Sequence, residues 1–306
     1  MSSKDIERAA EILRGGGLVA FPTETVYGLG ANALDPAAVE RIYAAKGRPA
    51  TSPLIVHVDS VAMAKSLVVD WPREADVLTE KFWPGALTLV LRKDSKVPDQ
   101  VTAGLDSVGL RMPSHPMALA LIRAAGVPIA APSANLFTQL SATTAEHVRR
   151  GLGNLVDMIL DGGPTTVGIE STVLSLAGPQ PILLRPGMIS QEDLESLIGP
   201  IRRAAATPGP QASPGLEPRH YRPRTPLFIG PPPDHGKGAY LWIHRPLSAA
   251  RAIAMPQKAS DYAAHLYELL HQLDAEGLDY IAVERPPDEP AWAGILDRLQ
   301  RAAENR

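Results

Sequence analysis

Three arginines occupy similar positions in the sequence and could bind an anion together. Arg48, Arg111 and Arg185 each lie at the end of a predicted helix or strand, shortly before a proline. A guanidinium group is permanently charged and donates two parallel hydrogen bonds, which suits phosphate. Lys46, two residues before the first arginine, adds a further cation. For any one arginine alone a solvated surface charge is the simpler interpretation, but the recurrence favours a shared phosphate site.

Polar segments beside predicted strands supply further candidates. Residues 21–30, with the sequence FPTETVYGLG, directly follow a buried strand, and ligand-binding loops of α/β sheets lie at strand ends. The segments 131–135 (APSAN) and 168–173 (GIESTV) contain small residues that allow backbone amides to approach a ligand. The alternatives are a tight connection whose hydroxyls bond their own backbone, and serines at 133 and 171 that only cap a helix or turn.

His57 interrupts the predicted strand with the sequence LIVHV. It is either a buried, hydrogen-bonded structural histidine or a side chain beside a pocket that contacts a small carboxylate. The glycines at 28 and 30 begin like a dinucleotide-binding motif, but Ala33 stands at its third small position and Asp35 begins the next helix too late. We therefore reject that motif.

The elements that must position these residues alternate between helices and strands, which predicts an α/β fold. Helices are predicted at Ser3–Arg14, Asp35–Ala45, Arg73–Phe82, Pro116–Ala125 and Ser190–Ile198, the last with a Ser190/Asp193 pair that approximates a capping box. Strands are predicted at Leu18–Phe21, Leu54–Val58, Ala86–Leu91, Val127–Ala131, Leu155–Leu160, Thr172–Leu176 and Ile182–Leu184.

A proline-rich stretch divides the chain. Residues 204–226 are predicted to be a linker between a domain at 1–203 and a small C-terminal α/β domain at 227–306. The second domain shows a βαβα pattern, with strands at Ala239–Ile243 and Leu278–Val283, a helix at Asp261–Glu276 and another from Pro290. The linker is either a passive spacer or a stiff strap laid along a surface.

Composition excludes several classes of protein. The chain has 306 residues, 45% of them hydrophobic, and no cysteine, so disulfides, thiolate nucleophiles and cysteine-bound metals are excluded. Residues 1–17 lack the apolar core of a signal peptide, and no run approaches the roughly 20 apolar residues of a membrane span. A net charge of −3 argues against a broad nucleic-acid surface. We expect a cytoplasmic protein with no membrane partner and no stable nucleic-acid binding.

The ordered set of motifs resembles the YrdC-like family of L-threonylcarbamoyladenylate synthases, in the long form with a C-terminal extension. The resemblance rests on FPTETVYGLGANA, the K-x-R element at 46–48, SPLIVHV, FWPGALTLVL, VGLRMPSHP, APSAN, GIESTV and LLRPG. These motifs cover nearly all of residues 1–200, while SPGLEPRHYRP at 213–223 resembles the linker motif of the family. The resemblance implies a twisted mixed-sheet catalytic domain followed by a small Rossmann-like α/β domain.

The resemblance also implies an activity. L-threonine, bicarbonate and ATP would give threonylcarbamoyl-AMP and pyrophosphate, and the product would pass to a tRNA threonylcarbamoyl transferase that modifies adenosine. Mg²⁺ would accompany ATP, with no metal ligand from the protein.

Carried over by motif, the site residues fall into three groups. Lys46 and Arg48 would be catalytic. L-threonine would be held by Thr25, His57, Arg111, Ala131 (through its backbone) and Ser171. ATP would be held by Arg48, Ser52, Ser107, Ser133, Ser141, Arg185 and, from the linker strap, Tyr221.

Two other functions are compatible with the pattern. The first is an RNA-binding module without catalysis, which the balance of 22 basic and 22 acidic side chains in residues 1–226 weakens. The second is a carbamoyl-adenylating enzyme with another acceptor, which the lack of accessory cysteine motifs argues against.

Overall fold

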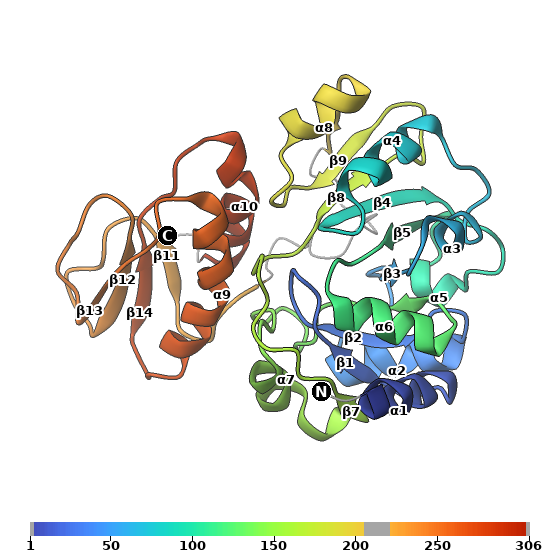
Figure 1. Ribbon diagram of the computed structural model, residues 1–306. Helices are drawn as coiled ribbons and strands as arrows, with labels where there is room; N and C mark the ends of the chain where they lie inside the picture. The colour runs from blue at the N-terminus through green and yellow to red at the C-terminus, as the bar shows by residue number, and fades with distance from the viewer. Residues whose placement is uncertain (1–2, 205–220, 304–306) are drawn as a thin grey trace.

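Two sheets of different size organise the chain (Figure 1). The computed structural model describes residues 3–204 and 221–303. The larger sheet has ten strands and the smaller has four, and helices accompany both. The expected fold class, a twisted mixed sheet followed by a small α/β unit, is confirmed. Most of the predicted linker lies outside the described residues, and the exact domain boundaries stay a prediction.

The ten-stranded sheet is mixed, in the order β10-β9-β8-β4-β5-β3-β6-β2-β1-β7. Its strands are β1 (Val19–Phe21), β2 (Gly28–Asn32), β3 (Ile55–His57), β4 (Leu87–Arg92), β5 (Ser107–Arg111), β6 (Ile129–Ala130), β7 (Met158–Ile159), β8 (Thr172–Ser175), β9 (Ile182–Arg185) and β10 (Arg202–Arg203). The register brings candidate residues together: β3 and β5 are parallel with His57 opposite Arg111, and β8 and β9 are antiparallel with Val173 opposite Arg185.

Several helices of this unit begin at a residue whose side chain caps them. They are α1 (Ser3–Arg14), α2 (Pro36–Lys46), α3 (Val61–Lys65), α4 (Arg73–Phe82), α5 (Asp99–Thr102), α6 (Pro116–Ala125), α7 (Ala145–Leu152), the 3₁₀ turn η1 (Gly153–Leu155) and α8 (Gln191–Ile198). The Asp35 carboxylate caps α2, and Gly47 ends it in a left-handed conformation. The predicted capping box of Ser190 and Asp193 is present at α8.

The structure corrects one interpretation of the N-terminal motif. Residues 28–32, which we expected to continue a turn-rich loop, form strand β2, antiparallel to β1. Glycine is depleted in strands, so propensity argued against this assignment. Here the absent side chain is required, because a Cβ at Gly30 would lie 2.7 Å from the Phe21 ring and 2.8 Å from Ile129.

The small sheet is parallel, in the order β11-β14-β12-β13. Its elements are β11 (Leu227–Ile229), β12 (Gly238–Trp242), β13 (Arg251–Ala254), α9 (Ala259–Asp274), β14 (Tyr280–Val283), the 3₁₀ turn η2 (Pro290–Trp292) and α10 (Ala293–Ala302). The predicted βαβα pattern is present, with β11 and β13 as additional strands. In Figure 1, α9 and α10 lie between the small sheet and the larger unit.

The two units share a hydrophobic core. Val26, Leu140 and Ile169 of the larger unit belong to the same buried cluster as Tyr262, Leu266 and other apolar residues of α9. None of the helices that the structure describes combines the length and apolar character needed to cross a bilayer.

Candidate active site

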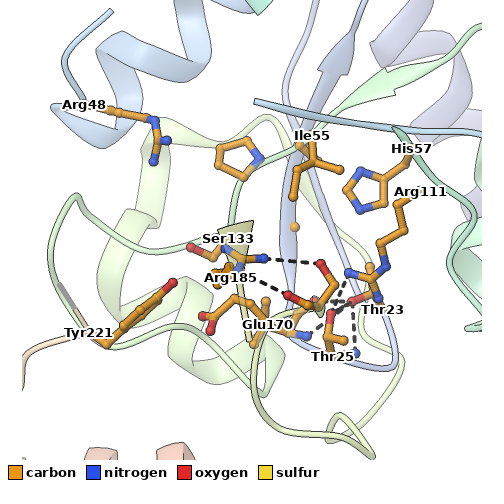
Figure 2. Close-up of a pocket in the computed structure, with 15 residues that line it drawn as sticks. Thr23, Thr25, Arg48, Ile55, His57, Arg111, Ser133, Glu170, Arg185 and Tyr221 are labelled. Carbon is orange, nitrogen blue, oxygen red and sulfur yellow. Dashed lines mark hydrogen bonds between the residues drawn. The ribbon is translucent and has the colours of Figure 1, made fainter. Parts of the chain in front are cut away.

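A pocket with an empty volume of about 500 Å³ gathers most of the candidate residues. Figure 2 shows His57, Arg111, Thr23 and Thr25 on one side and Arg48, Ser133 and Tyr221 on the other, with Arg185 and Glu170 between them. We call these the Arg111 side and the Arg48 side. Ile55, Val26, Gly28, Ala131, Pro132 and Ser171 complete the lining.

Arg111 is held rigidly at the end of β5. Its guanidinium donates to Glu24 Oε1 at 2.6 Å, to Thr25 Oγ1 at 2.9 Å and to the carbonyl of Gly85 at 3.2 Å. Burial opposes ionisation of Glu24, but the Arg111 charge and the hydrogen bonds that Glu24 accepts outweigh it and hold the pKa of Glu24 below its usual value. Arg111 is therefore paired with an ionised Glu24 and oriented beside a threonine hydroxyl, an arrangement suited to a carboxylate.

His57 is buried at the end of β3, and its Nδ1 atom has no hydrogen-bond partner. Burial, with the nearby Arg111 charge, lowers the pKa of His57 to about 3. A neutral imidazole with an unsatisfied nitrogen at a pocket wall is suited to a ligand donor or acceptor. Backbone groups of Ile55 and Ile129 also act on the ring, so a structural role and a contact with a ligand both stay predictions for His57.

Arg185 lies across the pocket at the end of β9. Its Nε donates to the Ser171 carbonyl at 3.1 Å and its Nη2 to Ser171 Oγ at 3.2 Å. Ser171 Oγ also lies 2.8 Å from Thr88 Oγ1. This chain of contacts fixes the arginine before any ligand arrives, which lowers the entropic cost of binding.

Lys46 is the last residue of α2 and Arg48 lies two residues later, but the two side chains have different surroundings. Arg48 lines the pocket and donates to Ser52 Oγ and to the Pro53 carbonyl. Lys46 Nζ instead donates to the carbonyls of Ser133 and Asn135. Burial, with the Arg48 charge nearby, lowers the pKa of Lys46 well below its usual value. Lys46 thus fixes the 131–135 segment, and its contact with phosphate stays a prediction.

Glu170 brings a carboxylate to the middle of the pocket, between the Arg111 side and the Arg48 side. It accepts from Ser141 Oγ at 2.5 Å, from Arg298 Nε at 2.7 Å and from Tyr267 Oη at 3.3 Å. Burial disfavours its charge, but Arg298 and Arg185 outweigh that effect and hold the pKa of Glu170 below its usual value. The carboxylate is therefore ionised, and the charges of nearby arginines offset its negative charge.

Tyr221 closes the Arg48 side of the pocket. It is 1% exposed, and its ring lies under the Arg298 guanidinium, 5.2 Å from Cζ to the centroid. Burial and the Glu170 charge raise the pKa of Tyr221 to about 12, so the phenol keeps its proton at neutral pH.

The predicted residues therefore fall into three sets. Those that line the pocket are Thr25, Arg48, His57, Arg111, Ala131, Ser133, Ser171, Arg185 and Tyr221. Lys46, Ser52 and Ser141 lie behind it and hold lining groups. Ser107 is not brought to this pocket, because it begins β5, four residues from Arg111, and pairs with Arg92. Neither Ser133 nor Ser171 caps a described helix.

Sequence reasoning missed three residues that hold the site. Glu24 and Glu170 lie inside quoted motifs, and an acidic residue in an otherwise small and apolar segment was the available signal. Arg298 lies on α10, outside the motifs considered, and no neighbouring residue in the sequence indicates that it contacts the site.

The described pocket lining holds a single carboxylate, Glu170, and the binding of Mg²⁺ together with ATP stays a prediction. No group of three metal-binding side chains occurs among residues 3–204 and 221–303. Glu170, which lines the pocket, is paired with Arg298, and Glu24, which lies behind the lining, is paired with Arg111. Mg²⁺ commonly keeps several waters and binds substrate phosphates, which agrees with this donor set.

Comparisons with known proteins agree with both units. The Sua5/YciO/YrdC profile, described as "Telomere recombination", matches residues 11–187. The profile described as "Threonylcarbamoyl-AMP synthase, C-terminal domain" matches residues 189–304.

Relatives resemble the chain over nearly its whole length. The threonylcarbamoyl-AMP synthase of Bacillus subtilis is 44% identical, over 98% of this chain and 93% of the relative. That of Pyrococcus abyssi is 40% identical, over 97% and 94%. The crystal structure of P. abyssi Sua5 complexed with L-threonine aligns with a TM-score of 0.93 at 39% identity, over 99% of this chain and 95% of that one.

Proposed function

This chain belongs to the threonylcarbamoyl-AMP synthase family, and from that premise we propose how its pocket divides the substrates. The activity is the formation of threonylcarbamoyl-AMP and pyrophosphate from L-threonine, bicarbonate and ATP. The observation that carries the assignment of roles is the convergence of three buried arginines, Arg48, Arg111 and Arg185, on one pocket. Such a set matches one carboxylate and a polyphosphate.

L-threonine occupies the Arg111 side in this proposal. Arg111 and Thr25 bind its carboxylate, and the unsatisfied Nδ1 of His57 bonds a polar group of the amino acid. Val26, Ile55 and Ala131 give this side apolar surface for the methyl group. The P. abyssi structure is named as a threonine complex, which supports threonine as the ligand.

ATP occupies the Arg48 side. Arg48 and Arg185 neutralise phosphate charge, Ser133 contributes polar contacts, and Tyr221 covers the nucleotide. Because Lys46 and Ser52 fix these groups in advance, little reorganisation is needed when charge develops at phosphorus.

The chemistry then requires orientation more than covalent participation by the protein. Bicarbonate gives CO₂ and hydroxide, and the threonine amine adds to the carbon of CO₂. The proton that the amine loses combines with the hydroxide, so the products are a carbamate and water. A carbamate oxygen attacks the α-phosphorus, the bond to the bridging oxygen breaks, and pyrophosphate leaves with the electron pair. Mg²⁺, bound with ATP, would offset phosphate charge. The arginines hold carboxylate and phosphate in line, and the pocket walls exclude water from the labile carbamate.

Pyrophosphate release from the purified protein tests the proposal. Release with ATP, Mg²⁺ and bicarbonate should require L-threonine, and L-serine should support less of it because it leaves the methyl site empty. Release without threonine, or equal release with serine, would contradict the division of the pocket. Tight, steeply salt-dependent RNA binding without release would favour the binding-module alternative.

The product is unstable in water, so we propose direct transfer to a tRNA threonylcarbamoyl transferase. Because ATP and tRNA are both available there, we place the reaction in the cytoplasm.

A further inference from the structure

Arg298 of the C-terminal unit reaches the wall of the pocket. It lies on α10, yet its side chain is 0% exposed. Its Nε donates to Glu170 Oε2 at 2.7 Å, its Nη2 to the Glu170 carbonyl at 3.2 Å and its Nη1 to the Pro186 carbonyl at 2.9 Å. One guanidinium therefore joins α10 to two segments of the larger unit, one beside Ser171 and one beside Arg185.

The same guanidinium also contacts Tyr221. Its Cζ lies 5.2 Å from the ring centroid, within the range of a cation–π interaction. Tyr221 has φ of +62°, a left-handed conformation that is unfavourable for a residue with a side chain and persists only where packing holds it. The Tyr221 ring also lies near the ring of Tyr267 on α9, with 6.0 Å between the two ring centroids. The C-terminal unit thus supplies the surroundings that keep this ring in place.

The ion pair between Glu170 and Arg298 affects the charge that a nucleotide would meet in the pocket. Glu170 and Arg185 both line the pocket between its Arg111 side and its Arg48 side. An unpaired carboxylate there would repel phosphate and compete for Arg185, with which it already interacts electrostatically. Arg298 pairs with Glu170 at 2.7 Å and also with Asp297 at 2.7 Å, and Arg301 pairs with Asp297 at 2.9 Å. This cluster of two carboxylates and two arginines carries no net charge, so Glu170 competes less with ATP for Arg185.

We propose that Arg298 is a positioning residue for ATP, through which the C-terminal unit orients Glu170 and Tyr221. The inference rests on the proposed placement of ATP on the Arg48 side. Arg298 does not line the pocket, so it acts through these two residues and not on substrate.

The test compares Arg298→Gln and Arg298→Lys with Arg251→Gln. Arg251 belongs to the same unit and also pairs with an acid, Glu276 at 2.7 Å, but half of its side chain is exposed. We expect Arg298→Gln to raise KM for ATP at least tenfold, with KM for L-threonine changed less than threefold. Lysine keeps the charge but cannot bridge Glu170 and Pro186 together, so we expect about a fivefold rise for Arg298→Lys. Arg251→Gln should match the wild type.

Two measurements keep the outcomes distinct. Thermal unfolding shows which variants fold, and calorimetric titration with a non-hydrolysable ATP analogue measures nucleotide binding without turnover. If the wild type binds the analogue but releases no pyrophosphate with threonine, the proposed function fails while Arg298 remains testable by binding. A folded Arg298→Gln or Arg298→Lys protein whose ATP affinity stays within twofold of the wild type overturns the proposal. It is also overturned if neither variant folds, since Arg298 would then serve folding alone.

Discussion

At the scale of single residues, Arg111 has two partners whose contributions can be separated. It faces the proposed threonine carboxylate and also neutralises the buried Glu24 at 2.6 Å. In Arg111→Ala the lost charge-assisted hydrogen bonds, about 1.5–3 kcal/mol, should raise KM for threonine about 10- to 100-fold. The unpaired carboxylate should also lower the free energy of unfolding by about 3 kcal/mol. Threonine-dependent pyrophosphate release and urea unfolding measure the two effects.

A second substitution tells these effects apart. Arg111→Ala/Glu24→Gln removes both charges and should recover most of the stability while the raised KM remains. Arg123→Ala, an exposed arginine on α6, is the matched control and should change neither quantity. A threonine KM within twofold of the wild type in the folded double variant would remove Arg111 from the substrate site.

His57 makes a prediction about acid stability. Burial lowers the pKa of His57 to about 3 in the folded protein, against about 6.5 for a free histidine side chain. The unfolded chain therefore binds this proton more readily, and stability falls as pH drops from about 6.5 towards 3, by up to about 1.4 kcal/mol per pH unit. In His57→Gln the free energy of unfolding should depend less on pH than in the wild type, by up to about 1.4 kcal/mol per pH unit, when urea unfolding is measured from pH 4.5 to 8. His235→Gln, at an exposed position, should keep the wild-type slope. An unchanged slope in His57→Gln would show that the histidine is protonated in the folded state.

At the scale of elements, strand β2 depends on glycine. A Cβ at Gly30 would lie 2.7 Å from Phe21 and 2.8 Å from Ile129, so Gly30→Ala forces β1 and β6 apart. We expect a loss of about 1–3 kcal/mol in the free energy of unfolding. Gly151→Ala in α7 has no atom within 4 Å of the new methyl group and should be neutral or stabilising by up to about 1 kcal/mol. Equal unfolding midpoints for the two variants in urea would mean that β2 tolerates a side chain.

Strand β2 also shows which elements a sequence pattern does not predict. Helices α4 and α6 have the bounds that capping residues and apolar spacing predicted, Arg73–Phe82 and Pro116–Ala125. Strand β2 consists of small residues, so propensity gave no signal, and its assignment depends on packing against Phe21. Helix α7 was missed although it carries helical signals: Ala145, Val148 and Leu152 are buried at a spacing of three and four residues, and the Thr144 hydroxyl caps its first turn. Only eight residues long, it offers few repeats of this spacing, so a periodic pattern is weakest in short elements.

At the scale of the whole molecule, a site residue could be predicted from the sequence where its position in a single helix or strand indicates its role. The three pocket arginines were predictable because each ends an element before a proline, and the sheet register then brings them together. Arg298 lies 128 residues from Glu170. On α10 it follows the buried Ile295 by three residues and precedes the buried Ala302 by four, which places it at the edge of the apolar face. Only the docking of α10 on the larger unit shows that its partner is Glu170. The Ser107 assignment stays a prediction that this pocket does not support.

That docking depends on a close approach of two backbones. A Cβ at Gly294 would lie 2.7 Å from the carbonyl oxygen of Gly187, and Arg298 stands one turn further along the same face of α10. Gly294→Ala should therefore push α10 away from the turn at Pro186, to which Arg298 donates. We expect a loss of about 1–3 kcal/mol in stability and a severalfold higher KM for ATP, measured by urea unfolding and pyrophosphate release.

Coupling between the two positions decides whether they act through one contact. If Gly294→Ala weakens ATP binding by withdrawing Arg298, then adding Arg298→Lys should raise KM for ATP by less than the product of the single effects. Gly178→Ala, in the exposed β8–β9 turn with no atom within 4 Å of the new methyl group, should instead combine multiplicatively with Arg298→Lys. A multiplicative result for Gly294→Ala as well would show that the interface and Arg298 act independently. The C-terminal unit would then influence the pocket by more than one route.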